Sequence, residues 1–440
     1  MNISVIGTGY LGAVHAACMA EIGHHVLGVD SNPEQIDKLS RGCPPFFEPG
    51  LADLLTRGIA AGRLRFSGSL REAADFGEVH FICVGTPQSA GALSADITSV
   101  DAVVEGLAPH LRGECIVVGK STVPAGTSAR LANQLAALAP AGVRVDLAWN
   151  PEFIREGLAI QDTLIPDRIV LGVRTARTAA VLRSVYEPIL AAGTPCLVTN
   201  FSTAELAKAA ANAFLATKIS FINAMADVCE AAGADVTVLA DALGFDRRIG
   251  HGSMSAGLGF GGGCLPKDLH SLLAQGAGLG VGDSLRLLHE VDRINGLRRA
   301  RVVELTRELI GRELADCHVA VLGAAFKPGT DDVRDSPALA VAHALQADGA
   351  QVRVHDPEAM ENARAAHPKL DYALDVKTVC EAADIVLHLT EWPQYRYIEP
   401  RTLRNIVRHP VILDARNALP LHRWRAAGWR ARSLGVGITT

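Results

Sequence analysis

The chain has 440 residues, 49% of them hydrophobic and 20% charged, which is too long for one ordinary core and fits two or three domains. Its formal net charge is −5 and its basic residues are dispersed, which argues against nucleic acid or a membrane surface as a partner. The nine cysteines form no Cys-x-x-Cys pair, and no run of about 20 uncharged apolar residues could span a bilayer. We therefore expect reduced thiols, no bound metal and a cytoplasmic protein.

The first part of the chain alternates short apolar runs with helical patterns. The runs lie at residues 3–6, 26–29, 79–84, 115–118, 145–148 and 169–172. Such an alternation predicts a parallel sheet with helices on both of its faces.

A helical pattern replaces this alternation between about residues 202 and 300. Its apolar stripe is expected to contain Leu206, Ala210, Ala213, Phe214, Thr217 and Ile219. Strand-like runs return at 318–323, 352–356, 385–389 and 411–414. We therefore expect an α/β fold in which a central helical region with a long helix joins two doubly wound, Rossmann-like domains. The expected boundaries are 1–200, 201–305 and 306–440.

Gly7, Gly9 and Gly12 form a Gly-x-Gly-x-x-Gly pattern directly after the first apolar run. In dinucleotide-binding folds the first glycine makes the turn, the second admits the pyrophosphate, and the third lets the helix pack on the strand. Asp30 ends the next strand, where its carboxylate would accept the ribose hydroxyls of NAD and repel the 2′-phosphate of NADP. The pattern predicts NAD; the alternative is a structural turn with Asp30 as a helix cap before Pro33.

Several polar residues follow other predicted strands, where open α/β sheets place their functional groups. Thr86 and Thr122 are candidates for the edge of the cofactor site, although either could be only a helix cap. Glu152 and Glu156 follow the strand at 145–148, and one of them could serve as a general base. The competing interpretation is structural capping or an ion pair with Arg155.

Cys264 ends a segment in which four of the five residues 259–263 are glycine. A cysteine can add to an aldehyde, lose hydride from the adduct and leave as a thioester that water cleaves. Lys267 would favour the thiolate and Asp268 could handle a proton, although Lys267 could equally be a solvated loop charge. Cys264 is therefore a candidate covalent catalyst.

Lys208 and Asn212 lie four residues apart, on a helical face that is otherwise alanine and leucine. The lysine could be a surface side chain with its stem on apolar residues. The alternative is a cation that stabilises an alkoxide or oxyanion, with Asn212 donating beside it.

Taken together, these motifs resemble the UDP-glucose/GDP-mannose dehydrogenase family over essentially the whole chain. The matching blocks are 81–87, 121–127, 150–157, 211–221, the Cys264 loop and 326–332. The resemblance implies two successive NAD-dependent hydride removals at C6 of a sugar nucleotide, the second through a Cys264 thioester. It also implies a UDP-sugar substrate and a homodimer or higher homo-oligomer built on the central helix.

The resemblance assigns further roles to individual residues. Lys208 and Asn212 would bind the C6 oxygen, Glu152 would act as acid and base, and Thr122 and Asp268 would position water. Arg248 would reach the substrate from a partner subunit. The implied cofactor contacts are Gly7, Gly9, Tyr10, Leu11, Gly12, Asp30, Thr86, Thr122, Glu156, Lys267 and Arg334. The implied substrate contacts are Glu152, Phe153, Arg155, Lys208, Asn212, Arg248, Phe260, Gly261, Cys264, Phe326, Lys327 and Arg416.

The chain departs from the family pattern at three positions. Ala209 follows Lys208 where tyrosine is usual, Gly263 replaces a common serine, and Ala224 replaces a common glutamate. Segments 166–170 and 233–236 favour UDP-glucose over GDP-mannose, and a UDP-N-acetylhexosamine stays open. A single-step NAD hydroxy-acid dehydrogenase would need no thiol, and a nucleotide-sugar sensor would bind ligand without making NADH.

Overall fold

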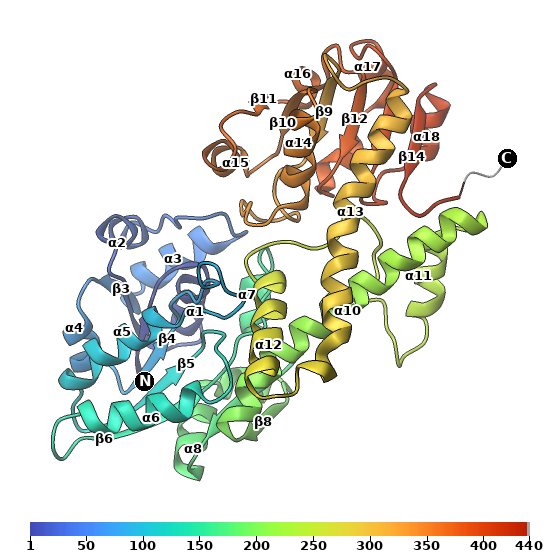
Figure 1. Ribbon diagram of the computed structural model, residues 1–440. Coiled ribbons are helices and arrows are strands. Elements are labelled where there is room, and N and C mark those ends of the chain that lie inside the picture. Colours follow the sequence, from blue (N-terminus) through green and yellow to red (C-terminus); the bar gives the residue numbers. More distant parts are fainter. Residues whose placement is uncertain (438–440) are drawn as a thin grey trace. The chain divides into compact units, whose positions relative to one another are not determined.

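The computed structural model describes residues 1–437, which form two compact units. The first unit comprises Met1–Ala211 and His270–Gly280, and the second comprises Asn212–Leu269 and the described chain from Val281 onward. Each unit is built on one β-sheet (Figure 1). The predicted α/β fold of two Rossmann-like domains joined by a long central helix is confirmed.

The first sheet has eight strands in the order β3-β2-β1-β4-β5-β6-β7-β8. Its strands are β1 Asn2–Ile6, β2 His25–Val29, β3 Leu64–Ser67, β4 Val79–Ile82, β5 Glu114–Gly119, β6 Arg144–Trp149, β7 Ile169–Val173 and β8 Cys196–Thr199. The short strands β3 and β8 lie at the two edges of the sheet, are only partly buried, and were missed from sequence.

The prediction of a wholly parallel sheet is wrong at one place, because β7 pairs with β6 in the antiparallel direction. The only helix between these strands is α7, Ala159–Leu164, which has six residues. Six helical residues span about 9 Å, whereas the six residues of β6 span about 20 Å. Helix α7 is therefore too short to carry the chain back along β6 to the level where that strand begins, as a parallel connection requires.

Helices cover both faces of the first sheet, as predicted. One core packs α1 (Tyr10–Glu21), α3 (Leu51–Ala60), α7 and α8 (Ala176–Val185) on one face. The other core packs helices on the opposite face. These are α4 Leu70–Phe76, α5 Thr98–Leu107 and α6 Thr127–Leu138; α2 Pro33–Ser40 and α9 Glu187–Ala191 complete the set before the central helix.

The central helix α10 runs over Phe201–Ala232. It begins after Asn200, whose side chain accepts the N–H of Thr203, and it ends at Gly233, whose φ is +71°. The expected apolar stripe is wrong in part, because Phe214 is 66% exposed and Leu206 is 38% exposed. Many of the buried positions of this helix hold alanine, which allows neighbouring elements to approach closely; they include Ala204, Ala209, Ala213 and Ala216.

The second sheet has six parallel strands in the order β11-β10-β9-β12-β13-β14. They are β9 His318–Leu322, β10 Gln351–His355, β11 Asp371–Tyr372, β12 Ile385–His388, β13 Val411–Asp414 and β14 Arg430–Ser433. The short β11 and the arginine-rich β14 were missed from sequence. The remaining helices are α11 Val236–Gly244, α12 Leu265–Gly278, α13 Arg286–Ile310, α14 Pro337–Ala347, α15 Met360–Ala366, α16 Val376–Cys380, α17 Pro400–Arg404 and α18 Leu421–Ala426.

All nine cysteines are free thiols. Within residues 1–437, no helix combines the length and the hydropathy needed to cross a bilayer. In the same range, His, Cys, Asp and Glu side chains form no group of three or more that could hold a metal ion.

Candidate active site

The three fingerprint glycines differ in what a side chain would meet. Gly7 has a φ of +85°, and a Cβ there would lie 2.7 Å from Val84. A Cβ at Gly12 would lie 1.8 Å from the carbonyl oxygen of Gly7, whereas a Cβ at exposed Gly9 would meet no atom within 4 Å. The turn and the close packing are therefore intrinsic to the chain, and the open space at Gly9 fits an approaching pyrophosphate.

Asp30 lies directly after β2 and faces the same turn. Its Oδ2 accepts the backbone N–H of Thr8 at 2.8 Å, and its Oδ1 accepts the N–H of Asn32 at 3.0 Å. The cap of helix α2 is Asn32 rather than Asp30, so the capping interpretation is wrong. A pocket lined by Asp30, Pro33, Ile36 and Gly68 adjoins the carboxylate. These residues fit the adenosine half of NAD.

Two other expected cofactor contacts, Tyr10 and Leu11, begin helix α1. The Tyr10 hydroxyl donates to the carboxylate of Glu48 and accepts the N–H of Gly157 at 3.0 Å. Glu48 also accepts the N–H groups of Gly157 at 2.6 Å and Ala159 at 2.8 Å. The Tyr10 side chain therefore ties the glycine turn to the segment that carries Glu152 and Glu156.

Thr86 and Thr122 meet at the carboxyl ends of β4 and β5. The Thr86 hydroxyl donates to the carbonyl oxygen of Thr122 at 2.8 Å. Neither threonine caps a helix, since α5 begins after Ile97 and α6 begins after Gly126. The capping interpretation of both residues is therefore wrong.

Glu152 and Lys208 form a buried ion pair in the first unit. The ammonium lies 3.0 Å from Glu152 Oε1, and the two side chains are only 11% and 5% exposed. The other oxygen, Oε2, accepts the N–H of Ile154 at 2.7 Å. Lys208 is therefore not a surface side chain, and the carboxylate is held beside a cation where a general acid or base is expected.

Arg155 and Phe153 flank this carboxylate in the chain. Arg155 binds Asp162 through its side chain at 2.6 Å and is 61% exposed, and the Glu152 carboxylate pairs with Lys208 rather than with Arg155. The Phe153 ring lies under Arg168, whose guanidinium carbon is 3.7 Å from the ring centroid. Lys208 lies 5.8 Å from the same centroid, so Phe153 packs directly against the buried ion pair.

Four of the expected catalytic and cofactor residues lie together in the second unit. Cys264 is exposed and directly precedes helix α12. One turn on, the buried carboxylate of Asp268 accepts from Asn212 Nδ2 at 2.6 Å and pairs with the ammonium of Lys267 at 2.6 Å. Lys267 is therefore no solvated loop charge. A helix N-terminus favours a thiolate, so the arrangement suits an accessible nucleophile beside an organised carboxylate.

Two of the glycines before Cys264 are required by what packs on them. A Cβ at Gly261 would lie 2.1 Å from the carbonyl oxygen of Asp335, and one at Gly262, whose φ is +83°, would lie 2.7 Å from the Phe326 ring. A Cβ at Gly263 would lie 2.5 Å from the guanidinium carbon of Arg334. That guanidinium is the end of a flexible side chain and pairs with Asp332 at 2.6 Å, so a serine at position 263 would displace a side chain and not the backbone.

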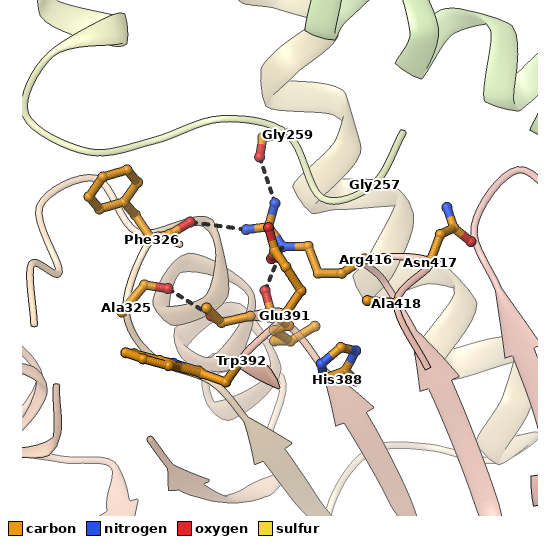
Figure 2. A network of polar contacts seen from close by, with 12 residues as sticks. Gly257, Gly259, Ala325, Phe326, His388, Glu391, Trp392, Arg416, Asn417 and Ala418 are labelled. Atoms are coloured by element: carbon orange, nitrogen blue, oxygen red, sulfur yellow. Dashed lines mark hydrogen bonds and ion pairs between the residues drawn. The ribbon is translucent and has the colours of Figure 1, made fainter. Parts of the chain in front are cut away.

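Arg416 fastens this loop to the second sheet (Figure 2). Its guanidinium donates to the carbonyl oxygens of Gly259 at 3.0 Å, Phe326 at 3.2 Å and Leu389 at 2.8 Å, and lies 3.2 Å from Glu391. The predicted role of Arg416 as a substrate contact stays a prediction. What the contacts establish is that Arg416 shapes the loop that ends in Cys264.

The other expected substrate contacts lie in different surroundings. Phe260 is 5% exposed, and its N–H donates to Asn295 Oδ1 at 2.8 Å. The Lys327 ammonium lies 5.7 Å from the centroid of the Phe326 ring. The Arg248 side chain is 88% exposed and pairs with Asp246 at 2.5 Å. An outward position suits the predicted reach toward a partner subunit, which stays a prediction.

Comparison with known proteins assigns the family. Residues 1–190 match the NAD binding domain of the UDP-glucose/GDP-mannose dehydrogenase family, residues 202–296 its central domain and residues 320–420 its UDP binding domain. The chain belongs to this family. The predicted resemblance, enzyme class and cofactor are thereby confirmed.

Individual relatives span the full length of this dehydrogenase chain. UDP-glucose 6-dehydrogenases of Bacillus subtilis (TuaD) and Rhizobium meliloti are each 40% identical, over 99% of the chain and 93% and 99% of their own lengths. The structure of a UDP-glucose dehydrogenase from Pyrobaculum islandicum superposes with a TM-score of 0.91 at 38% identity and covers 100% of this chain and 98% of its own.

Adding one methyl group at Gly9 or at Gly12 distinguishes the effect of the dinucleotide turn on folding from its effect on NAD binding. We expect Gly9→Ala to leave the unfolding midpoint unchanged, because its φ of −63° suits any residue and the space is open, but to weaken NAD binding at least about tenfold through steric conflict with phosphate. Gly12→Ala should instead lower the free energy of unfolding by about 2 kcal/mol. Thermal unfolding and calorimetric titration with NAD measure both effects. Equal NAD binding by wild type and Gly9→Ala would contradict the assignment.

Three buried charged residues near the site of this dehydrogenase were not predicted from its sequence. Glu48 is described above, and Glu205 accepts the N–H groups of Gly126 at 2.7 Å and Ser128 at 2.6 Å. Lys120 directly follows strand β5 and is 7% exposed. In the sequence, each of these residues stands out only as a single charge in an apolar segment or in one rich in glycine and proline. Such a pattern does not indicate which residue the charged side chain binds.

Proposed function

We propose that the protein is a UDP-glucose 6-dehydrogenase that oxidises the C6 alcohol of UDP-glucose to the carboxylate of UDP-glucuronate in two NAD-dependent steps. The observation that carries this proposal is the exposed Cys264 at the start of α12, one turn from the Asp268 carboxylate held by Asn212 and Lys267. The full-length relatives named UDP-glucose 6-dehydrogenase supply the substrate.

In the first oxidation the C6 hydroxyl must lose a proton and a hydride. Bound NAD accepts the hydride in both oxidations. Lys208 and Asn212 stabilise the developing alkoxide, since an ammonium and an amide N–H both favour negative charge on oxygen. Glu152, whose carboxylate pairs with Lys208, takes the proton. The product of this step is an aldehyde at C6.

In the second oxidation the Cys264 sulfur adds to the aldehyde carbon to form a thiohemiacetal, which loses its hydroxyl proton and a hydride and becomes a thioester. Water then cleaves the C–S bond, which returns the thiol and yields the C6 carboxylate. Asp268 and Thr122 position that water, and Glu152 accepts its proton. Each sugar therefore yields two NADH.

The expected cofactor and substrate contacts belong to the same proposal. Gly7, Gly9 and Gly12 receive the pyrophosphate, and Asp30 receives the ribose hydroxyls. Arg334, Lys267 and Glu156 are the remaining charged contacts assigned to NAD, and Phe326, Lys327 and Arg416 are assigned to the UDP-sugar. The free state of all nine cysteines is consistent with a reducing cytoplasm.

We also propose a homodimer that uses helix α10. Phe214, Phe221 and Val228 recur every seven residues along this helix and are 66%, 49% and 55% exposed. Such a spacing places all three on nearly the same face. An exposed apolar stripe of this kind is typical of a protein interface.

We further propose that UDP-glucuronate, the product of the reaction, serves polysaccharide biosynthesis.

The proposed substrate is tested by NADH progress curves with UDP-glucose, UDP-N-acetylglucosamine, UDP-N-acetylmannosamine and GDP-mannose in parallel. We expect UDP-glucose to turn over fastest and to give two NADH per sugar. A ratio of one would indicate a single-step dehydrogenase, and turnover of another sugar with UDP-glucose idle would overturn the substrate. Ligand binding without NADH would indicate a sensor.

A further inference from the structure

Lys120 is a buried cation that no step described above uses. It directly follows strand β5 and precedes Ser121 and Thr122. Its ammonium donates to Asn150 Oδ1 at 3.0 Å, and it lies 5.9 Å from the centroid of the Phe81 ring. The residue is 7% exposed, so its charge is held almost entirely away from water.

Keeping such a charge inside the protein is costly. Among residues 1–437, no carboxylate lies within ion-pair distance of the Lys120 ammonium, whose nearest polar partner is a neutral amide. Burial lowers the pKa of Lys120, and the nearby Cys83 and Glu152 oppose that shift. A methionine of similar length would fill the same space without the desolvation penalty. Stability therefore does not explain the presence of a lysine at this buried position.

The charged and titratable groups around Lys120 come from several elements. His15 of α1, Cys83 after β4 and Tyr186 after α8 are all buried, and burial disfavours the charged form of each. The remaining neighbour is Glu152, whose carboxylate is paired with Lys208. Glu152 is therefore the neighbour of Lys120 that already takes part in an ion pair.

Lys120 also fixes the backbone that presents Glu152. Asn150, two residues earlier, uses Oδ1 to accept from both Lys120 and the Tyr186 hydroxyl, the latter at 2.6 Å, and its Nδ2 donates to the carbonyl oxygen of Val170 at 2.9 Å. The turn that starts at Asn150 is thus anchored on three sides. Only one of these anchors is charged.

We propose that Lys120 is a positioning residue that acts through Asn150, and through its buried charge, to hold the Glu152 carboxylate in place beside Lys208. In the proposed function, on which this inference rests, Lys208 faces the substrate oxygen and Glu152 takes the proton. Lys120 then supports Glu152 from the end of strand β5 while Lys208 is engaged with the substrate.

The test compares Lys120→Met with Tyr186→Phe in the full-length enzyme. Both variants remove one donor to Asn150 Oδ1, but only Lys120→Met removes a charge. We expect Lys120→Met to keep or raise the unfolding temperature, to lower kcat at least about tenfold, and to move the acid limb of the kcat profile up by about one pH unit. Tyr186→Phe should leave that limb in place.

Three outcomes would overturn the proposal. Lys120→Met with wild-type kcat and an unmoved acid limb would show that the charge does not act on Glu152. Identical pH profiles for the two variants would reduce Lys120 to a hydrogen-bond anchor. A large loss of stability in Lys120→Met, with unchanged kcat per folded molecule, would make its role structural. The assays use whichever sugar nucleotide the unaltered enzyme oxidises, so a wrong substrate would count against the proposed function alone.

Discussion

Replacing Cys264 with alanine should abolish formation of the uronic acid while leaving the fold intact. The side chain is exposed, so its removal creates no cavity, and the thioester has no other sulfur to form on. We expect the rate of acid formation to fall by roughly three orders of magnitude or more, as for other enzymes that lose their nucleophile. The measurement is chromatography of the sugar nucleotides together with the NADH yield.

The matched control is Cys43→Ala, which removes the other exposed cysteine and should keep two NADH per sugar. Any aldehyde made by Cys264→Ala should be trapped by an added hydrazine as the one-NADH product. A Cys264→Ala enzyme that still gives two NADH and uronic acid would refute the covalent mechanism.

Replacing Lys208 with methionine should cost both stability and activity, because it leaves the 11% exposed Glu152 carboxylate without its 3.0 Å partner. Breaking a buried ion pair from one side destabilises a protein by about 3–5 kcal/mol. Loss of the cation beside the alkoxide should lower kcat by about 10²–10³-fold. Urea unfolding and single-turnover NADH formation measure the two effects separately.

The double variant Lys208→Met/Glu152→Gln separates these contributions, since it removes both charges. It should recover most of the lost stability but none of the activity. Lys218→Met is the control on the same helix, because that ammonium donates to the carbonyl oxygens of Ile249 and Gly250. Full activity in Lys208→Met would exclude an electrostatic role for this lysine.

Local patterns along the chain predicted most of the fold and the candidate residues. Glycine spacing identified the dinucleotide turn, and the glycine run identified Cys264, because both depend on backbone geometry that is encoded within a few residues. The direction of β7 was not predictable in this way, because it depends on how far the segment after Trp149 carries the chain. The exposure of Phe214 was likewise hidden, since hydrophobicity does not say which side of a helix is covered.

Contacts between residues far apart in the sequence could not be predicted either. Nothing in the local sequence of Glu48 or Glu205 indicates that they bind backbone N–H groups 109 and 79 residues away. The sequence likewise indicated that Lys208 needed a reason on its apolar face, but not that Glu152, 56 positions earlier, was its partner. Hydrogen bonds between residues this far apart in the chain can be identified only from the three-dimensional structure.

The chain passes between its two compact units at 211/212, 269/270 and 280/281. Neither unit is consequently a continuous stretch of polypeptide, and no single truncation isolates one intact. A fragment ending at residue 200 would lose Glu205 and Lys208, and one ending at 211 would still lack Gln275, which donates to the carbonyl oxygen of Ala125. Attempts to express a minimal cofactor-binding half, or to split the gene for complementation, should therefore retain α10 and α12 whole.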